Sequence, residues 1–167
     1  MTLINPELHI IDKTYENEDV FSNIVTYAFR LNSKQTLPIF CYGIWPPTYE
    51  NIVNEFETTR KQSKYKPTKH VWHIVLSFPY KNIESRAYCF ANDIAKVFAQ
   101  NYQIFYTFHN DTEHGHFHFF INTTSFLPEY PILDHKKMKT FEEKILYLAS
   151  NNYKTSLNVN WKIESMS

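Results

Sequence analysis

Hydrophobic and polar residues alternate with a period of two in four segments of this chain, residues 70–78, 102–109, 116–122 and 157–163. Such alternation is typical of β-strands that bury one face and leave the other polar. Residues 8–11 are a candidate edge strand, and residues 39–42 are a candidate strand within a loop. The pattern therefore predicts a sheet of about five strands.

Four other segments carry apolar residues at helical spacing, residues 20–31, 48–61, 85–100 and 140–150. Acidic residues precede the first segment, and Thr48 is a suitable N-cap for the second. Thr140 and Glu143 form a capping box for the fourth. Together the patterns predict an α+β fold, with a mainly antiparallel central sheet, flanking helices against one face, and the histidines described below on the other.

The length of 167 residues predicts one domain, residues 1–167, with a sizeable core. No apolar segment approaches the roughly 20 residues of a membrane span, and the N-terminal residues lack the pattern of a secretory signal. Cys41 and Cys89 are isolated, which favours a reducing compartment over a disulfide framework. We therefore expect a cytoplasmic protein with no membrane partner.

The formal net charge of zero argues against tight, non-specific binding of duplex DNA, although a local basic cluster is enough to steer a strand. The chain has two glycines and hence no glycine-rich phosphate-binding loop. A nucleoside triphosphatase is therefore without support.

Four of the eight histidines lie within ten residues, between His109 and His118. His116 and His118 are two residues apart, so their side chains share one face of a strand. The turn-forming residues before them predict a hairpin that places His109 opposite His116. Three convergent imidazoles suit a borderline divalent cation that keeps an open position for a phosphate oxygen. The alternative is that several of these histidines are surface or core residues.

The loop between the histidines offers further candidates. Asp111 is placed to accept a hydrogen bond from a ligand imidazole, or it is only an Asx-turn residue. Glu113 and His114 lie close enough in sequence to approach the metal, although His114 departs from the alternation and is expected to be exposed.

One motif combines these residues with a nearby asparagine: His109-x-Asp111-Thr112, His116-x-His118 and Asn122. It resembles the third motif of the MobA/MobL-like mobilisation relaxases of plasmids and integrative conjugative elements, within the HUH endonuclease superfamily. The order of elements agrees from about residue 20 to about residue 150.

The resemblance implies a single relaxase domain, a site- and strand-specific nickase that cuts and rejoins DNA through a 5′-phosphotyrosine intermediate during mobilisation or conjugative transfer. It implies a manganese, magnesium or zinc ion held by the three histidines. It also implies single-stranded DNA at an origin of transfer as the substrate, with accessory relaxosome proteins and a coupling protein as candidate partners.

Tyr27 lies beside the apolar stripe of the first expected helix. By position alone it is a core tyrosine whose hydroxyl reaches a polar neighbour. In the resembled family the nucleophile is a tyrosine at about this distance from the N-terminus, followed by a basic residue, which here is Arg30. The resemblance thus implies that Tyr27 is the catalytic nucleophile and that Arg30 contacts DNA.

A basic segment precedes the strand at residues 70–78, and it is either a solvated loop or a DNA contact. Its candidate DNA-binding residues are Arg60, Lys61, Lys64, Tyr65, Lys66 and Lys69. Ser77 is a further candidate because a serine in this position lies near the bound strand in the resembled family; otherwise it is a strand-end hydroxyl. His73, on the same strand, either supports the metal ligands or is structural.

Two other functions stay open. A rolling-circle replication initiator of the same superfamily has its tyrosine on a helix after the histidine motif, and Tyr147 is the residue that this alternative requires. A non-catalytic DNA-binding module with a structural metal is the second alternative.

Overall fold

The structure is a computed structural model that describes residues 3–15, 17–29, 39–110 and 112–164. Its elements in chain order are β1 (Glu7–Lys13), α1 (Val20–Phe29), β2 (Ile39–Tyr42), α2 (Tyr49–Gln62), β3 (Val71–Phe78), α3 (Ser85–Ala99), β4 (Tyr102–His109), β5 (Gly115–Ser125), α4 (His135–Tyr153) and β6 (Asn158–Glu164).

The strands form one sheet in the order β2-β4-β5-β3-β1-β6. Every neighbouring pair is antiparallel except β1 and β6, which run parallel. The α+β fold with a mainly antiparallel sheet is thus confirmed, with six strands where about five were expected. The expectation that residues 8–11 form an edge strand is wrong, because β6 pairs along the outer side of β1.

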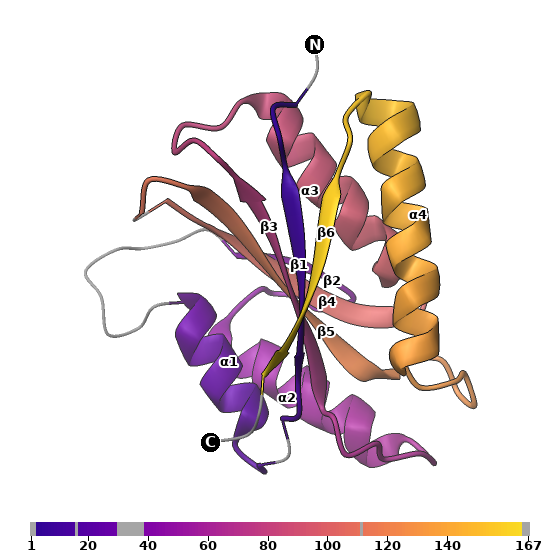
Figure 1. Ribbon diagram of the computed structural model, residues 1–167. Coiled ribbons are helices and arrows are strands. Elements are labelled where there is room, and N and C mark those ends of the chain that lie inside the picture. The colour runs from indigo at the N-terminus through magenta and orange to yellow at the C-terminus, as the bar shows by residue number, and fades with distance from the viewer. Residues whose placement is uncertain (1–2, 16, 30–38, 111, 165–167) are drawn as a thin grey trace.

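Helices cover both faces of the sheet, which corrects the expectation that they lie against one (Figure 1). α3 and α4 contact each other on one face, and α1 and α2 contact each other on the opposite face. The second pair contacts β4 and β5. Within the described residues, α1 and α2 therefore lie mainly over the β4–β5 side of this face.

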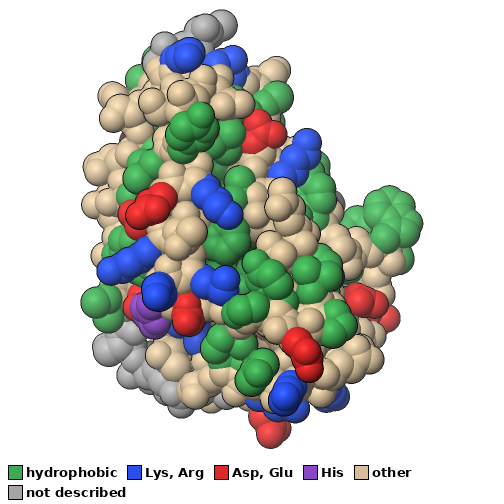
Figure 2. Space-filling model, turned by 90° about the vertical axis from the view of Figure 1, so that its right-hand side faces the viewer, with side chains coloured by type: hydrophobic (Ala, Val, Ile, Leu, Met, Phe, Trp, Pro, Cys, Tyr) green, Lys and Arg blue, Asp and Glu red, His purple; other side chains and the backbone are tan. Residues whose placement is uncertain are grey.

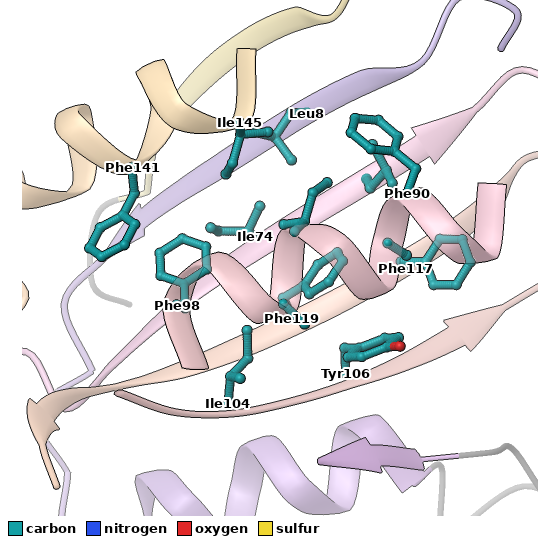
Figure 3. Close-up of a cluster of buried hydrophobic side chains, with 14 of the residues drawn as sticks. Leu8, Ile74, Phe90, Phe98, Ile104, Tyr106, Phe117, Phe119, Phe141 and Ile145 are labelled. Atoms are coloured by element: carbon teal, nitrogen blue, oxygen red, sulfur yellow. The ribbon is translucent and has the colours of Figure 1, made fainter. Parts of the chain in front are cut away.

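The larger core fills the space between the sheet and the α3–α4 pair (Figure 3). The alternating apolar residues of β3 point into it, as expected, together with Phe117 and Phe119 of β5 and Phe90 and Phe98 of α3. Burial of each such aromatic side chain contributes about 1.5–3 kcal/mol to folding. A smaller core joins α1 and α2 to the sheet through Ile24, Phe56, Phe105 and Phe120.

Two helix starts test the capping predictions. Thr48 caps α2, its side chain accepting a hydrogen bond from the amide of Asn51, as expected. The capping box at Thr140 is wrong, because α4 begins at His135 and Asp134 accepts the cap hydrogen bond from the amide of Lys137. Among the described residues, no helix is long and apolar enough to cross a membrane.

Candidate active site

The histidines lie on the sheet face that α1 and α2 share. β4 and β5 form the expected hairpin, in which His109 is paired with His116. On the other side of β5, His116 is paired with Ser77 and His118 with Val75. Since side chains alternate along a strand, His109, His116 and His118 point to the same face.

The imidazoles of this face form a row across three strands. The ring centres of His109 and His118 are 4.5 Å apart, and those of His116 and His118 are 6.1 Å apart. His73 on β3 continues the row, with its ring centre 5.2 Å from that of His118. His118 therefore has a histidine neighbour on each side.

Hydrogen bonds orient two of these rings. Nε2 of His109 lies 3.2 Å from the carbonyl oxygen of Ala28 in α1. Because a carbonyl oxygen only accepts, Nε2 of His109 carries the hydrogen. Nδ1 of His118 lies 3.0 Å from Nε2 of His73. His73 is buried, and its burial, followed by the charges of His109 and Lys13, lowers its pKa from 6.5 to about 3, so its ring is neutral near neutral pH.

Tyr27 lies over this row. Its ring centre is 5.5 Å from that of His118 and 5.9 Å from that of His109, each in an edge-on contact. The neighbouring residues of α1, Ile24 and Ala28, are buried in the smaller core, while Tyr27 itself is 46% exposed. Tyr27 is therefore not a core tyrosine: the helix is anchored by its buried face and holds the phenol at the surface.

Two cavities flank Tyr27. One, of about 510 Å³, lies between α1, the end of β1 and the sheet, and Lys13, Tyr15 and Asn23 are among its lining residues. The other, of about 290 Å³, lies towards β6, and His9 and Lys162 contribute to its wall. Both cavities are also lined by Tyr27 and His118. A chain-like ligand has room on either side of the phenol.

Comparison with family models matches residues 27–152 to the Relaxase family, described as MobA/VirD2-like, nuclease domain. The match covers most of the chain and begins at Tyr27. This chain is a member of the MobA/VirD2-like relaxase family. Relaxases of this family are nucleases that nick DNA in mobilisation. Separate comparisons with curated proteins and with solved structures gave no match.

The donor set of this relaxase fits a divalent cation by its chemistry, and two of its ring-to-ring distances are compatible with a shared cation. Imidazoles that share one tetrahedral cation at about 2.1 Å from each nitrogen have ring centres roughly 5 Å apart, which the two observed distances bracket. Within the described ranges, no three His, Cys, Asp or Glu side chains place their ligating atoms around one point. Binding therefore requires rotation of at least one ring, while β4 and β5 already hold His109 opposite His116.

The basic segment of the relaxase divides into two groups. Arg60 donates to the carbonyl oxygen of Pro67 at 2.7 Å, and burial lowers its pKa. Lys69 pairs with Asp12 at 3.0 Å and lies over the ring of Trp72. Both side chains are engaged within the fold. The remaining candidates are exposed at the surface: Lys61, Lys64, Tyr65 and Lys66.

This segment lies next to the larger cavity. The ammonium group of Lys69 donates to the carbonyl oxygen of Lys13, and His70 contacts the carbonyl oxygen of Tyr15 at 2.7 Å. Lys13 and Tyr15 both line that cavity. The position of the basic segment is compatible with a strand of DNA that leaves the cavity along this segment.

Two of the remaining candidates from the sequence, Ser77 and Tyr147, lie on opposite sides of the sheet. Ser77 is buried on the histidine face beside His116. Tyr147 is 68% exposed on α4, on the opposite side of the sheet from the histidines. Arg30 and Asp111 lie outside the described residues.

Sequence reasoning missed the residues that β1 and β6 bring to the cavities, including His9, Lys13 and Lys162. The alternation of β1 places His9 on the face opposite to that of the buried Leu8 and Ile10, but nothing in the local pattern shows that β1 lies beside β3.

Figure 2 shows that the face on the α4 side mixes Lys and Arg with Asp, Glu and apolar side chains. A concentration of one charge is not visible on that face.

Proposed function

We propose that this relaxase nicks and rejoins one strand of DNA by transesterification through Tyr27. The phenol oxygen attacks the scissile phosphorus, loses its proton and forms a P–O bond, while the bond from phosphorus to the 3′ oxygen breaks and that oxygen takes up a proton. The 5′ end stays joined to Tyr27. The observation that carries this proposal is an exposed phenol whose ring centre lies 5.5 Å from that of His118.

Rejoining follows from the same geometry. A phosphotyrosine ester keeps much of the energy of the original phosphodiester, so a 3′ hydroxyl can attack it and restore the strand. For this the site must retain the released end. The two cavities beside Tyr27 provide positions for nucleotides on both sides of the scissile phosphate.

In this proposal His109, His116 and His118 hold a manganese, magnesium or zinc ion, whose contribution when bound is to polarise the scissile phosphate. Neutral imidazole ligands leave such a site positively charged, which suits an anionic diester. The chain itself contributes the strand register that gathers the three rings and the helix that holds Tyr27 above them.

Single-stranded DNA at an origin of transfer is the proposed substrate, with accessory relaxosome proteins and a coupling protein as proposed partners. A net charge of zero is poorly suited to non-specific duplex binding. This substrate is supported by two cationic side chains, because Lys13 lines one of the cavities beside Tyr27 and Lys162 lines the other.

The decisive experiment uses single-stranded oligonucleotides from the transfer origin of the genetic element, incubated with and without Mn²⁺ and resolved on a denaturing gel. With a label at the 3′ end of the oligonucleotide, we expect the label to appear on the protein. With a label at the 5′ end, we expect a shorter free fragment that ends in a 3′ hydroxyl. Transfer of the 5′ label to the protein, or cleavage without any covalent product, contradicts the proposal.

A further inference from the structure

His73 lies outside the motif, and its surroundings hold its ring in one place. Its side chain is 8% exposed on the central strand β3. Its ring stacks on Phe120, with the ring centres 4.4 Å apart and the planes 15° from parallel. The packing leaves little freedom for rotation of the imidazole.

The contact between His73 and His118 joins two ring nitrogens, Nε2 of His73 and Nδ1 of His118, at 3.0 Å. This is an ordinary length for a hydrogen bond between nitrogen atoms, and such a bond needs a hydrogen on one nitrogen and a lone pair on the other. Since Nδ1 of His118 is engaged in this bond, a cation has to be bound by Nε2. Nδ1 must then carry the hydrogen, and Nε2 of His73 must accept it.

We propose that His73 is a positioning residue that fixes the tautomer and the ring plane of His118, so that His118 presents the lone pair of Nε2 to the active site. This inference rests on the proposed function, because it assigns His118 as a ligand. Ligand histidines usually donate their second ring N–H to a carboxylate, a backbone carbonyl or water. Here a buried imidazole takes that place.

An imidazole differs from a carboxylate in one respect that matters for this chemistry. A carboxylate adds a negative charge beside a site that has to bind an anionic phosphodiester. The neutral ring of His73 orients His118 without that charge. The carbonyl oxygen of Ala28 does the same for His109, so these two acceptors, both within the described residues, are uncharged.

The test compares the wild-type protein with His73→Phe and His73→Gln, which respectively remove the acceptor and replace it by an amide oxygen. Nitrogen NMR of the imidazoles in the metal-free protein identifies which nitrogen of His118 carries the hydrogen. We expect the Nδ1–H tautomer in the wild type, a shift towards the Nε2–H tautomer in His73→Phe, and recovery in His73→Gln. His135→Phe is the matched control, because His135 lies at the start of α4 on the opposite side of the sheet and should leave the tautomer of His118 unchanged.

Titration with Mn²⁺ provides the second measurement. We expect the affinity to fall about 10–100-fold in His73→Phe and to recover in His73→Gln, as is typical when the orienting partner of a ligand is removed. A purely structural role of His73 would lower the melting temperature of both variants without this recovery.

The wild-type spectrum alone can overturn the inference, even where the variants do not fold. An Nε2–H tautomer of His118 in the wild type contradicts it, as does an unchanged tautomer in a folded His73→Phe variant. Failure of the proposed function is seen in a different measurement. A wild type that forms no covalent DNA adduct would contradict the proposed function, but it would not change the tautomer of His118 observed by NMR.

Discussion

Nε2 of His109 lies 3.2 Å from the carbonyl oxygen of Ala28, a residue 81 positions earlier in the chain. Ala28 directly follows Tyr27, so this hydrogen bond ties the helix that carries the proposed nucleophile to the hairpin that carries the histidines. The bond also fixes which nitrogen of His109 bears the hydrogen. The distance between phenol and imidazoles is thus set by the docking of α1 on the sheet.

Tyr27→Phe should abolish covalent attachment to a single-stranded oligonucleotide, because the ring stays in place and only the attacking oxygen is lost. Tyr147→Phe should retain attachment, since Tyr147 is exposed on α4, on the other side of the sheet. A denaturing gel with a 3′-labelled oligonucleotide measures both variants. Attachment that survives in Tyr27→Phe and disappears in Tyr147→Phe would favour a replication initiator instead.

His109→Ala and His118→Ala should each weaken Mn²⁺ binding by more than the roughly 10–100-fold expected for loss of an orienting partner. Each substitution removes one of two rings whose centres are 4.5 Å apart. Isothermal titration of the metal-free protein measures the affinity, and His135→Ala, at the start of α4 on the other side of the sheet, is the control. Equal affinity in all three variants would place the cation elsewhere.

The chelator response distinguishes a catalytic from a structural metal. We expect chelation to stop nicking while the melting temperature changes little, because the sheet is held by two apolar cores that do not involve the metal. Thermal unfolding with and without chelator measures this. A large fall in melting temperature would support the non-catalytic binding module.

Combined substitution of Lys64 and Lys66 by alanine should weaken binding of single-stranded DNA and reduce its salt dependence. Each lost phosphate contact lowers the slope of log K against log salt by about 0.7. Fluorescence anisotropy of a labelled oligonucleotide at several salt concentrations measures the slope. The matched control replaces Lys136 and Lys139, which are exposed on α4. An equal loss of DNA affinity in both double variants would mean that the overall charge of the protein controls binding, and not a defined contact of Lys64 and Lys66 with the DNA.

Asp134→Ala should destabilise the fold by about 1 kcal/mol, since it removes the side chain that caps α4. Thr140→Ala should cost less, because Thr140 lies inside the helix and donates to the carbonyl oxygen of Lys136. Urea unfolding of both variants gives the comparison. A larger loss of stability in Thr140→Ala than in Asp134→Ala would support the capping box at Thr140 that the sequence predicts.

Asp12→Asn should lower stability near neutral pH by about 1 kcal/mol, because Asp12 accepts charge-assisted hydrogen bonds from Lys69 and His135. Burial raises the pKa of Asp12, but these hydrogen bonds outweigh it and leave the pKa below its ordinary value of 3.8. The stabilisation is therefore complete above that value and is lost as the pH falls through the lowered pKa.

Urea unfolding at about pH 7 and at about pH 3 should show the difference between wild type and Asp12→Asn shrinking at the acidic value. Glu143→Gln, on the exposed side of α4, is the control and should show no such change. A difference that grows on acidification would contradict the assigned role of Asp12.

The alternation along residues 102–122 was sufficient to predict the β4–β5 hairpin, the pairing of His109 with His116 and the shared face of His116 and His118. These features depend on the period of a strand and on a short loop, both of which are local. The identity of Tyr27 as a candidate came from the resemblance, because an exposed and a buried tyrosine beside an apolar stripe look alike in sequence.

Only the tertiary structure decided which residues from distant segments meet the histidines. α1 docks on the histidine face and brings Tyr27 over His118, and β3 lies beside β5 so that His73 contacts His118. β1 lies between β3 and β6, which brings His9 and Lys162 to the same cavity. A periodic pattern shows which side chains share a face of one element, whereas the order of strands and the docking of helices depend on burying apolar surface across the whole chain.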